Sequence, residues 1–298
     1  MTRIGAIFVP HWYPPEDLPV AARAAEAAGL GELWLWEDCF VHSAYAAASV
    51  ALASTQNLRV GVGISPMPMR NVATSAMEIA TVARLFPGRI LPGMGHGVQS
   101  WMGQIGARVA SPLTLMREYL PALRSLLAGE TVSVSGRYVS LDDVTLGWPP
   151  ADPPVVYAAA EGPKTLALAG ELAQGVVLDS RHTPAEIATA VAAVRAGRER
   201  AHDGAIDIVA RDGAIDIVAY VQTAFGADAA SRARAVFGEE PAADVDQRFL
   251  AGDPEDVAHG ARAFFDAGVD AVILLPTRDA DLAHFYGSAG EVARLIEG

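Results

Sequence analysis

The fold is decided by residues 58–92, which read LRVGVGISPMPMRNVATSAMEIATVARLFPGRILP. The apolar runs Leu58–Ile64 and Ile90–Pro92 are bounded by turn residues, a pattern that is typical of buried parallel strands. Between them, Asn71–Leu85 is an amphipathic stretch that ends before a Pro-Gly pair, and it predicts a helix. The stretch therefore predicts a strand–helix–strand unit whose two strands run parallel.

The same alternation continues toward both ends of the chain. Further strands are predicted at Ile4–Val9, Leu33–Trp36, Val155–Ala159, Gly175–Leu178, Ile215–Thr223 and Ala271–Leu275. Further helices are predicted at Leu18–Ala28, Pro112–Leu127, Pro163–Ala173, Pro184–Arg200 and Pro254–Ala267. Eight strands, each followed by a helix, predict an α/β protein that forms a single (β/α)8 TIM barrel over residues 1–298. An open doubly wound sheet has the same local pattern and is the alternative.

Two segments interrupt the alternation. Thr131–Leu141, with Gly136 at its centre, predicts a small inserted β-hairpin. Later in the chain, Asp203–Ala210 and Asp212–Ala219 both read DGAIDIVA, at an offset of nine residues. Because nine is odd, one strand running through both copies would turn them to opposite faces. We therefore expect the second copy to form the seventh barrel strand and the first to be an insertion before it, on the face away from the chemistry.

The composition excludes several classes of protein. With 51% hydrophobic and 19% charged residues, the chain has material for a large core. Its net charge of −13 disfavours nucleic acid and anionic lipid as partners. One cysteine, Cys39, allows no intramolecular disulfide and suits a reducing compartment. The opening residues read as a strand rather than a signal peptide, and no apolar run is long enough for a membrane span. We therefore expect a cytoplasmic protein.

Candidate catalytic residues are the polar residues that follow the predicted strands, because a barrel carries its active site on those loops. They are His11 and Trp12, Glu37 and Asp38, Ser65, His96, Glu161, Asp179 to His182, and Thr277 with Arg278. Among them His96 is flanked by glycines and is the preferred proton donor, with His11 and Asp38 as further acid–base candidates. A structural histidine and a solvated turn are the alternatives for His96 and Asp38.

Two glycine-containing segments could accept a cofactor. Gly93-Met94-Gly95-His96-Gly97 would let a planar ring lie against the backbone, although its spacing is not the dinucleotide-binding pattern. Glu161-Gly162-Pro163 precedes a helix, whose exposed N–H groups make an anion site. A plain turn is the alternative in both places. We expect no metal site, because the usual ligand motifs are absent from the sequence.

Several segments together resemble the luciferase-like flavin and deazaflavin oxidoreductases, and within them the actinobacterial branch that uses coenzyme F420. They are LWLWED at 33–38, VGVGISP at 60–66 followed by Arg70-Asn71, PGRILPGMGHG at 87–97, AAEGPK at 159–164 with AGELA at 169–173, and GDPEDV at 252–257. Each is weak alone, but all five occur in the family's order.

The resemblance implies a tricyclic cofactor ring in the mouth of the barrel. It implies a non-proline cis peptide at Gly63–Ile64 behind the ring, with Ser65, Gly95 and His96 nearby. Asp38 would contact the polar edge of the ring, and the backbone of Ala160, Glu161, Gly162 and Pro163 would hold the phosphate. Sugar-phosphate dehydrogenases of the family carry His and Glu where this chain has Cys39 and Val98. Their acid–base scheme and their substrate therefore do not transfer.

The functional hypothesis is an F420-dependent oxidoreductase that moves a hydride between the deazaflavin and a small organic substrate. The alternatives are a two-component monooxygenase that uses reduced FMN, a barrel that binds cofactor without catalysis, and a metal-dependent hydrolase, which the missing ligand motifs oppose. A homodimer is expected because dimers are common among proteins of this kind.

Overall fold

A computed structural model describes residues 2–203, 214–238 and 244–297. Within these residues eight parallel strands close into a barrel in the order β11-β1-β2-β3-β4-β7-β8-β9, because β9 pairs with both β8 and β11. The strands are β1 (Arg3–Ile7), β2 (Glu32–Leu35), β3 (Arg59–Pro66), β4 (Ile90–Gly95), β7 (Tyr157–Ala159), β8 (Gly175–Leu178), β9 (Asp216–Phe225) and β11 (Ala271–Leu275). The closure confirms the predicted TIM barrel and excludes the open sheet.

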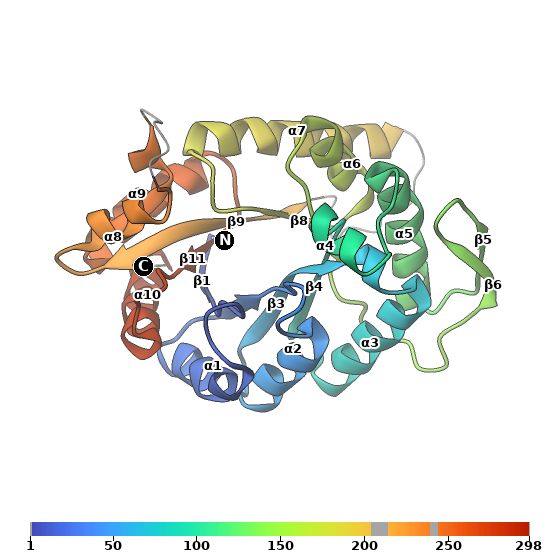
Figure 1. Ribbon diagram of the computed structural model, residues 1–298, viewed down its shortest axis with the longest axis horizontal. Helices are drawn as coiled ribbons and strands as arrows, with labels where there is room; N and C mark the ends of the chain where they lie inside the picture. The colour runs from blue at the N-terminus through green and yellow to red at the C-terminus, as the bar shows by residue number, and fades with distance from the viewer. Residues whose placement is uncertain (1, 204–213, 239–243, 298) are drawn as a thin grey trace.

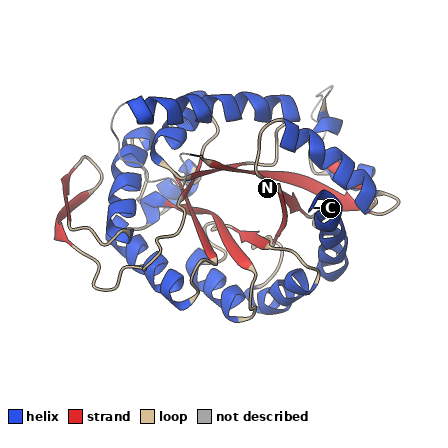
Figure 2. Ribbon diagram, turned by 180° about the vertical axis from the view of Figure 1, so that it is seen from behind, coloured by secondary structure: helices blue, strands red, loops and turns tan. Residues whose placement is uncertain are grey.

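Helices surround the strands on the outside, as Figures 1 and 2 show. They are α1 (Leu18–Ala27), α2 (Ala44–Ala53), α3 (Val72–Leu85), α4 (Gln99–Gln104), α5 (Pro112–Leu127), α6 (Pro163–Leu172), α7 (Pro184–Asp203), α8 (Ala229–Ala235), α9 (Pro254–Asp266) and α10 (Leu282–Glu297), with short 3-10 turns η1 (Pro15–Asp17), η2 (Met67–Met69) and η4 (Val245–Gln247). Proline opens α5, α6, α7 and α9, as its fixed φ favours. Gly29, at a φ of +90°, follows α1 and ends it where the sequence predicted.

The barrel strands bury alternate side chains in two separate layers. Trp34, Tyr157 and Tyr220 fill the inside of the barrel, whereas Leu33 and Leu35 pack outward against the helices. Trp34 lies directly on Gly61, and a Cβ at that position would overlap the indole ring. The interior is therefore a packed core, and only the ends of the strands are free to form a site.

The structure contains four helices that the sequence analysis did not predict, α2, α4, α8 and α10, and it also differs from the predicted strands. β10 (Phe249–Gly252), which the sequence analysis missed, adds a parallel strand beside β9. β4 continues to Gly95, so Gly93 and Gly95 belong to the strand rather than to the loop after it. The predicted hairpin is present as β5 (Val132–Ser135) and β6 (Ser140–Val144), and it extends beyond Leu141, with Val132 paired to Val144 across a register shift. In Figure 1 it stands at the edge of the molecule, beside α5.

The duplicated segment enters the barrel through its second copy. β9 begins at Asp216, inside that copy, and pairs in register with β8 and β11. The expectation that the second copy forms the strand is therefore confirmed. Residues 204–210 of the first copy lie outside the described residues. In the parts of the chain that the structure describes, no helix combines the length and the apolar character needed to cross a bilayer.

Candidate active site

The mouth of the barrel is built around Trp36 and Tyr220. Trp36 follows β2 and donates from Nε1 to Oδ2 of Asp38 at 2.8 Å. Its ring centroid lies 6.3 Å from that of Tyr220, whose hydroxyl donates to the carbonyl oxygen of Gly63 at 3.3 Å. Asp38 and Gly63, which are 25 positions apart, are thus linked through two aromatic side chains at the same end of the barrel.

A wall of small residues continues from β3 to β7. The Gly63–Ile64 peptide bond is cis, as the resemblance implies, and so is the Cys39–Phe40 bond. Gly95 packs against Ile64, since a Cβ on Gly95 would lie 2.9 Å from Cδ1 of Ile64 and 3.6 Å from Cβ of Ala159. Without a side chain at Gly95, the side chain of Ile64 lies directly on the backbone of β4.

The start of α6 lies after β7, the next strand around the barrel. Its cap residue is Gly162, and no side chain accepts a hydrogen bond from its first turn. Pro163 has no N–H, whereas the N–H groups of Lys164 and Thr165 precede the first internal helix bond, Leu166 N to Gly162 O. The space in front of Gly162 is open to 4 Å. By contrast, α9 begins with a complete capping box between Asp253 and Asp256. The start of α6 is therefore able to receive an anion.

The two predicted catalytic histidines differ in setting. His96 follows β4 and is partly buried, and its Nδ1 lies 2.8 Å from the carbonyl oxygen of Gly97. His11 lies in the turn after β1 and is exposed. His96 is the better placed of the two, because one ring nitrogen is already oriented by the backbone next to the Gly95 wall.

A third histidine forms a pair that sequence reasoning did not identify. His182 Nε2 lies 2.9 Å from Oδ1 of Asp179, directly after β8. The hydrogen bond that His182 donates to Asp179 raises the pKa of His182 despite partial burial, and the carboxylates of Glu186 and Glu161 add to the effect. Burial opposes ionisation of Asp179, but the hydrogen bond and charge of His182 outweigh it and lower the pKa of that carboxyl. The i, i+3 spacing just after a strand was the available signal.

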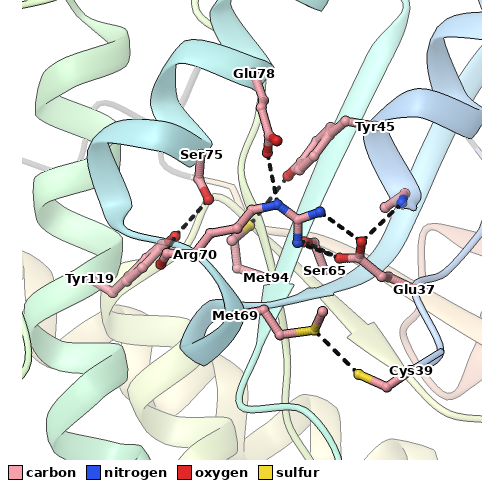
Figure 3. Close-up of polar contacts among 11 residues, drawn as sticks. Glu37, Cys39, Tyr45, Ser65, Met69, Arg70, Ser75, Glu78, Met94 and Tyr119 are labelled. Carbon is pink, nitrogen blue, oxygen red and sulfur yellow. Dashed lines mark hydrogen bonds and ion pairs between the residues drawn. The ribbon is translucent and has the colours of Figure 1, made fainter. Parts of the chain in front are cut away.

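Behind the mouth, a charged cluster occupies the layer between strands and helices (Figure 3). Glu37 accepts from both terminal nitrogens of Arg70, at 2.6 and 2.7 Å. It also accepts from Oγ of Ser65 at 2.9 Å and from the backbone N–H of Ala44 at 3.2 Å. Arg70 Nε lies 2.9 Å from Glu78 on α3. Ser65, a predicted cofactor residue, thus turns its hydroxyl toward Glu37, and its side chain is fully buried.

Aromatic side chains enclose this cluster. Tyr119 donates to Oγ of Ser75 at 2.7 Å, and its hydroxyl also lies 3.3 Å from the carbonyl oxygen of Arg70. The guanidinium carbon of Arg70 lies 5.8 Å from the ring centroid of Tyr45. Burial raises the pKa of Tyr119 to about 12. The hydrogen bonds to Glu37 raise the pKa of Arg70, so the guanidinium is a permanent cation.

Cys39 is unsuited to act as a nucleophile. Its side chain is buried, and its Sγ donates to Sδ of Met69 at 3.3 Å. Burial and the carboxylates of Glu37 and Asp38 raise the pKa of the thiol. A reactive cysteine requires the opposite shift, and packing is the role that the structure gives it.

Two surface hollows lie away from the mouth. One of about 610 Å³ lies among α8, β10 and α9, and another of about 340 Å³ lies beside the end of β9 and the loop after β11. None of the predicted site residues lines either hollow. The mouth is therefore defined by the strand ends rather than by the size of a surface depression.

The model of the luciferase-like monooxygenases matches residues 10–271 of the chain. The chain belongs to the luciferase-like monooxygenase family. A 5,10-methylenetetrahydromethanopterin reductase of Methanolobus tindarius is 31% identical over 180 residues, which is 60% of this chain and 55% of that protein. The chain thus matches just over half the length of this curated relative. An F420-dependent glucose-6-phosphate dehydrogenase of Amycolatopsis mediterranei is 26% identical over 308 residues, 92% of each chain.

Among solved structures, an F420-dependent secondary alcohol dehydrogenase in complex with an F420-acetone adduct superimposes with a TM-score of 0.86. The two chains are 19% identical, and the match covers 99% of both. At this identity the likeness shows the fold alone, and it is the same luciferase-like barrel.

Proposed function

We propose that the protein is an F420-dependent oxidoreductase that transfers a hydride between the deazaflavin and a small organic substrate. The observation that carries the proposal is the uncapped start of α6 at the same end of the barrel as the Gly63–Ile64 wall. The first suits a phosphate and the second suits a planar ring. Two of the compared proteins are named as F420-dependent, which supports the same cofactor.

The residues at the mouth fit this group. Ile64, whose side chain packs on Gly95, would lie against a face of the ring. Asp38, whose carboxylate is oriented by Trp36, would accept from the polar edge of the ring. The backbone from Ala160 to Pro163, with the free N–H groups of α6, would hold the phosphate.

When bound, the deazaflavin supplies hydride transfer. The chain supplies orientation and a place for the proton that accompanies the hydride. We assign that proton to His96 rather than to His11, because His96 is partly buried and held by Gly97, whereas His11 is exposed. Removing the imidazole should lower kcat by about a hundredfold or more, with little change in cofactor affinity.

A fluorescence titration of the apoprotein with F420 and, separately, with FMN tests the cofactor. We expect F420 to bind with a Kd of about 1 μM or tighter, and the deazaflavin fragment without its phosphate to bind more weakly. Tight FMN binding without F420 binding would overturn the proposal and favour the two-component monooxygenase, which the family's description keeps as the second candidate. Tight F420 binding without turnover of any substrate would instead indicate a non-catalytic carrier.

The finer expectations belong to the same proposal. The protein would act in the cytoplasm, as a homodimer, on a small molecule and without nucleic acid or membrane. Size-exclusion chromatography with light scattering checks the dimer.

A further inference from the structure

The loop after β3 carries an arginine whose contacts reach every element behind the cofactor wall. Arg70 binds Glu37 after β2, Ser65 on β3 and Glu78 on α3, at 2.6–3.2 Å. Its carbonyl oxygen lies 3.3 Å from the hydroxyl of Tyr119 on α5. Only 13% of its side chain is exposed, so these contacts replace water almost completely. The guanidinium is held on one edge by the buried carboxylate of Glu37 and on the other by the partly exposed carboxylate of Glu78, which restricts its orientation.

The segment that faces the mouth is fixed from behind by the same contacts. The backbone N–H of Glu37 donates to the carbonyl oxygen of Ile64 at 3.0 Å. One residue further, Ser65 donates its hydroxyl to Glu37 and accepts from Arg70 at 3.2 Å. Glu37 therefore touches Ile64 and Ser65 in succession, and Arg70 sets where Glu37 lies.

We propose that Arg70 and Glu37 are positioning residues that hold Gly63–Ile64–Ser65 in the place where the cofactor ring packs. Neither side chain enters the mouth; both act through the backbone of Ile64 and the hydroxyl of Ser65. The proposal rests on the proposed function, because the readout is F420 affinity. It predicts that cofactor binding depends on a salt bridge that the cofactor does not touch.

The chain supplies a matched control on the same strand. Arg59 begins β3 and binds Glu32 at the opposite end of the barrel. Arg59→Met removes the guanidinium that begins β3, and Arg70→Met removes the one in the loop after it. We expect Arg59→Met to lower Tm and to leave the Kd for F420 within twofold. Arg70→Met should lower Tm and also raise the Kd by about tenfold or more, as is typical when an orienting group behind a binding residue is lost. Arg70→Lys should recover part of the affinity.

Two measurements separate positioning from general stability. The double variant Glu37→Met/Arg70→Met removes both buried charges and should regain thermal stability without regaining affinity. If Arg70→Met does not fold, the F420 affinity of the double variant tests the proposal in its place. In the apoprotein, hydrogen exchange of the Glu37 amide, which reports its bond to Ile64, should accelerate in Arg70→Met and remain slow in Arg59→Met.

The inference is overturned if folded Arg70→Met and the double variant bind F420 with the wild-type Kd. A failure of the proposed function gives a different result, because wild-type protein would then bind no F420. In that case hydrogen exchange at Glu37 still decides whether Arg70 holds the Ile64 segment.

Discussion

Two buried glutamates at opposite ends of β2 are each held by arginines, yet they lie in different layers of the molecule. Glu32 begins β2 and binds Arg3 and Arg59 at the floor of the barrel, with Trp34 donating to it at 2.8 Å. Glu37 follows β2 and binds Arg70 behind the mouth. Glu32 accepts from Trp34, whose ring fills the inside of the barrel, whereas Glu37 accepts from the backbone N–H of Ala44 on α2, so the two carboxylates face different layers.

The difference in position gives the two clusters different tasks. The floor cluster joins strands to strands, because Arg3 also binds Asp216 of β9 and Asp216 accepts from Tyr157 of β7. The cluster at the mouth joins strand ends to helices, through Ala44 of α2 and Glu78 of α3. Similar ion pairs therefore close the barrel at one end and position a binding segment at the other.

The largest expected effect is at the floor. Glu32→Ala leaves two arginines without their common partner, and we expect it to lower the free energy of unfolding by about 3 kcal/mol, the lower end for breaking a buried ion pair because both arginines reach solvent. Chemical denaturation measures the loss. The folded fraction of this variant should bind F420 with the wild-type Kd. A tenfold weaker Kd would contradict the claim that the Glu32 cluster stabilises the barrel without positioning the binding segment.

A smaller effect is expected where the interior meets the mouth. A Cβ on Gly63 would overlap the hydroxyl of Tyr220 and lie 3.2 Å from Cε3 of Trp34. Gly63→Ala should therefore cost about 1–3 kcal/mol of stability through overpacking and should weaken F420 binding. Gly31→Ala is the control, because a Cβ at Gly31 meets nothing within 4 Å. Equal Tm and Kd values for the two variants would show that Tyr220 and Trp34 move to accommodate the added methyl group without cost.

The smallest effect is expected at the partly exposed pair after β8. Asp179→Asn should lower the pKa of His182 toward its ordinary value of 6.5, as an NMR titration of the imidazole would show. In the wild type, the raised pKa of His182 gives stability that is lost as pH rises through it. The lowered pKa of Asp179 gives stability that is lost as pH falls through it. The pair therefore stabilises the fold only between these two values. An unchanged His182 pKa in Asp179→Asn would mean that the carboxylates of Glu186 and Glu161, rather than Asp179, raise the pKa of the imidazole.

Much of the fold could be predicted because its signals are local. The strands on either side of Asn71–Leu85, the proline that opens α6 and the glycine that ends α1 each depend on a few neighbouring residues. β10 was missed because Phe249–Gly252 is short, ends in glycine and has no alternation to reveal it. Its partner in β9 is 27 positions earlier in the chain, so no local pattern could supply the pairing.

The candidate site divides in the same way. The strand-end rule placed Asp38, His96 and Gly162 at one end of the barrel, since parallel strands carry their carboxyl ends to one face. It could not reveal that Ser65 turns toward Glu37, or that Arg70 joins them across 33 positions of sequence. Nor could it reveal that Asp179 and His182 bond to each other rather than to solvent.

The sequence by itself determined the barrel and its eight parallel strands, because hydrophobic period and turn residues act over short distances. Only the tertiary structure showed what each of two neighbouring acids contacts. Asp38 is held by Trp36 at the mouth, and Glu37 is buried behind it with Arg70. The partners of Glu37 come from segments that the closure of the barrel and the packing of the helices bring together, which no local pattern can supply.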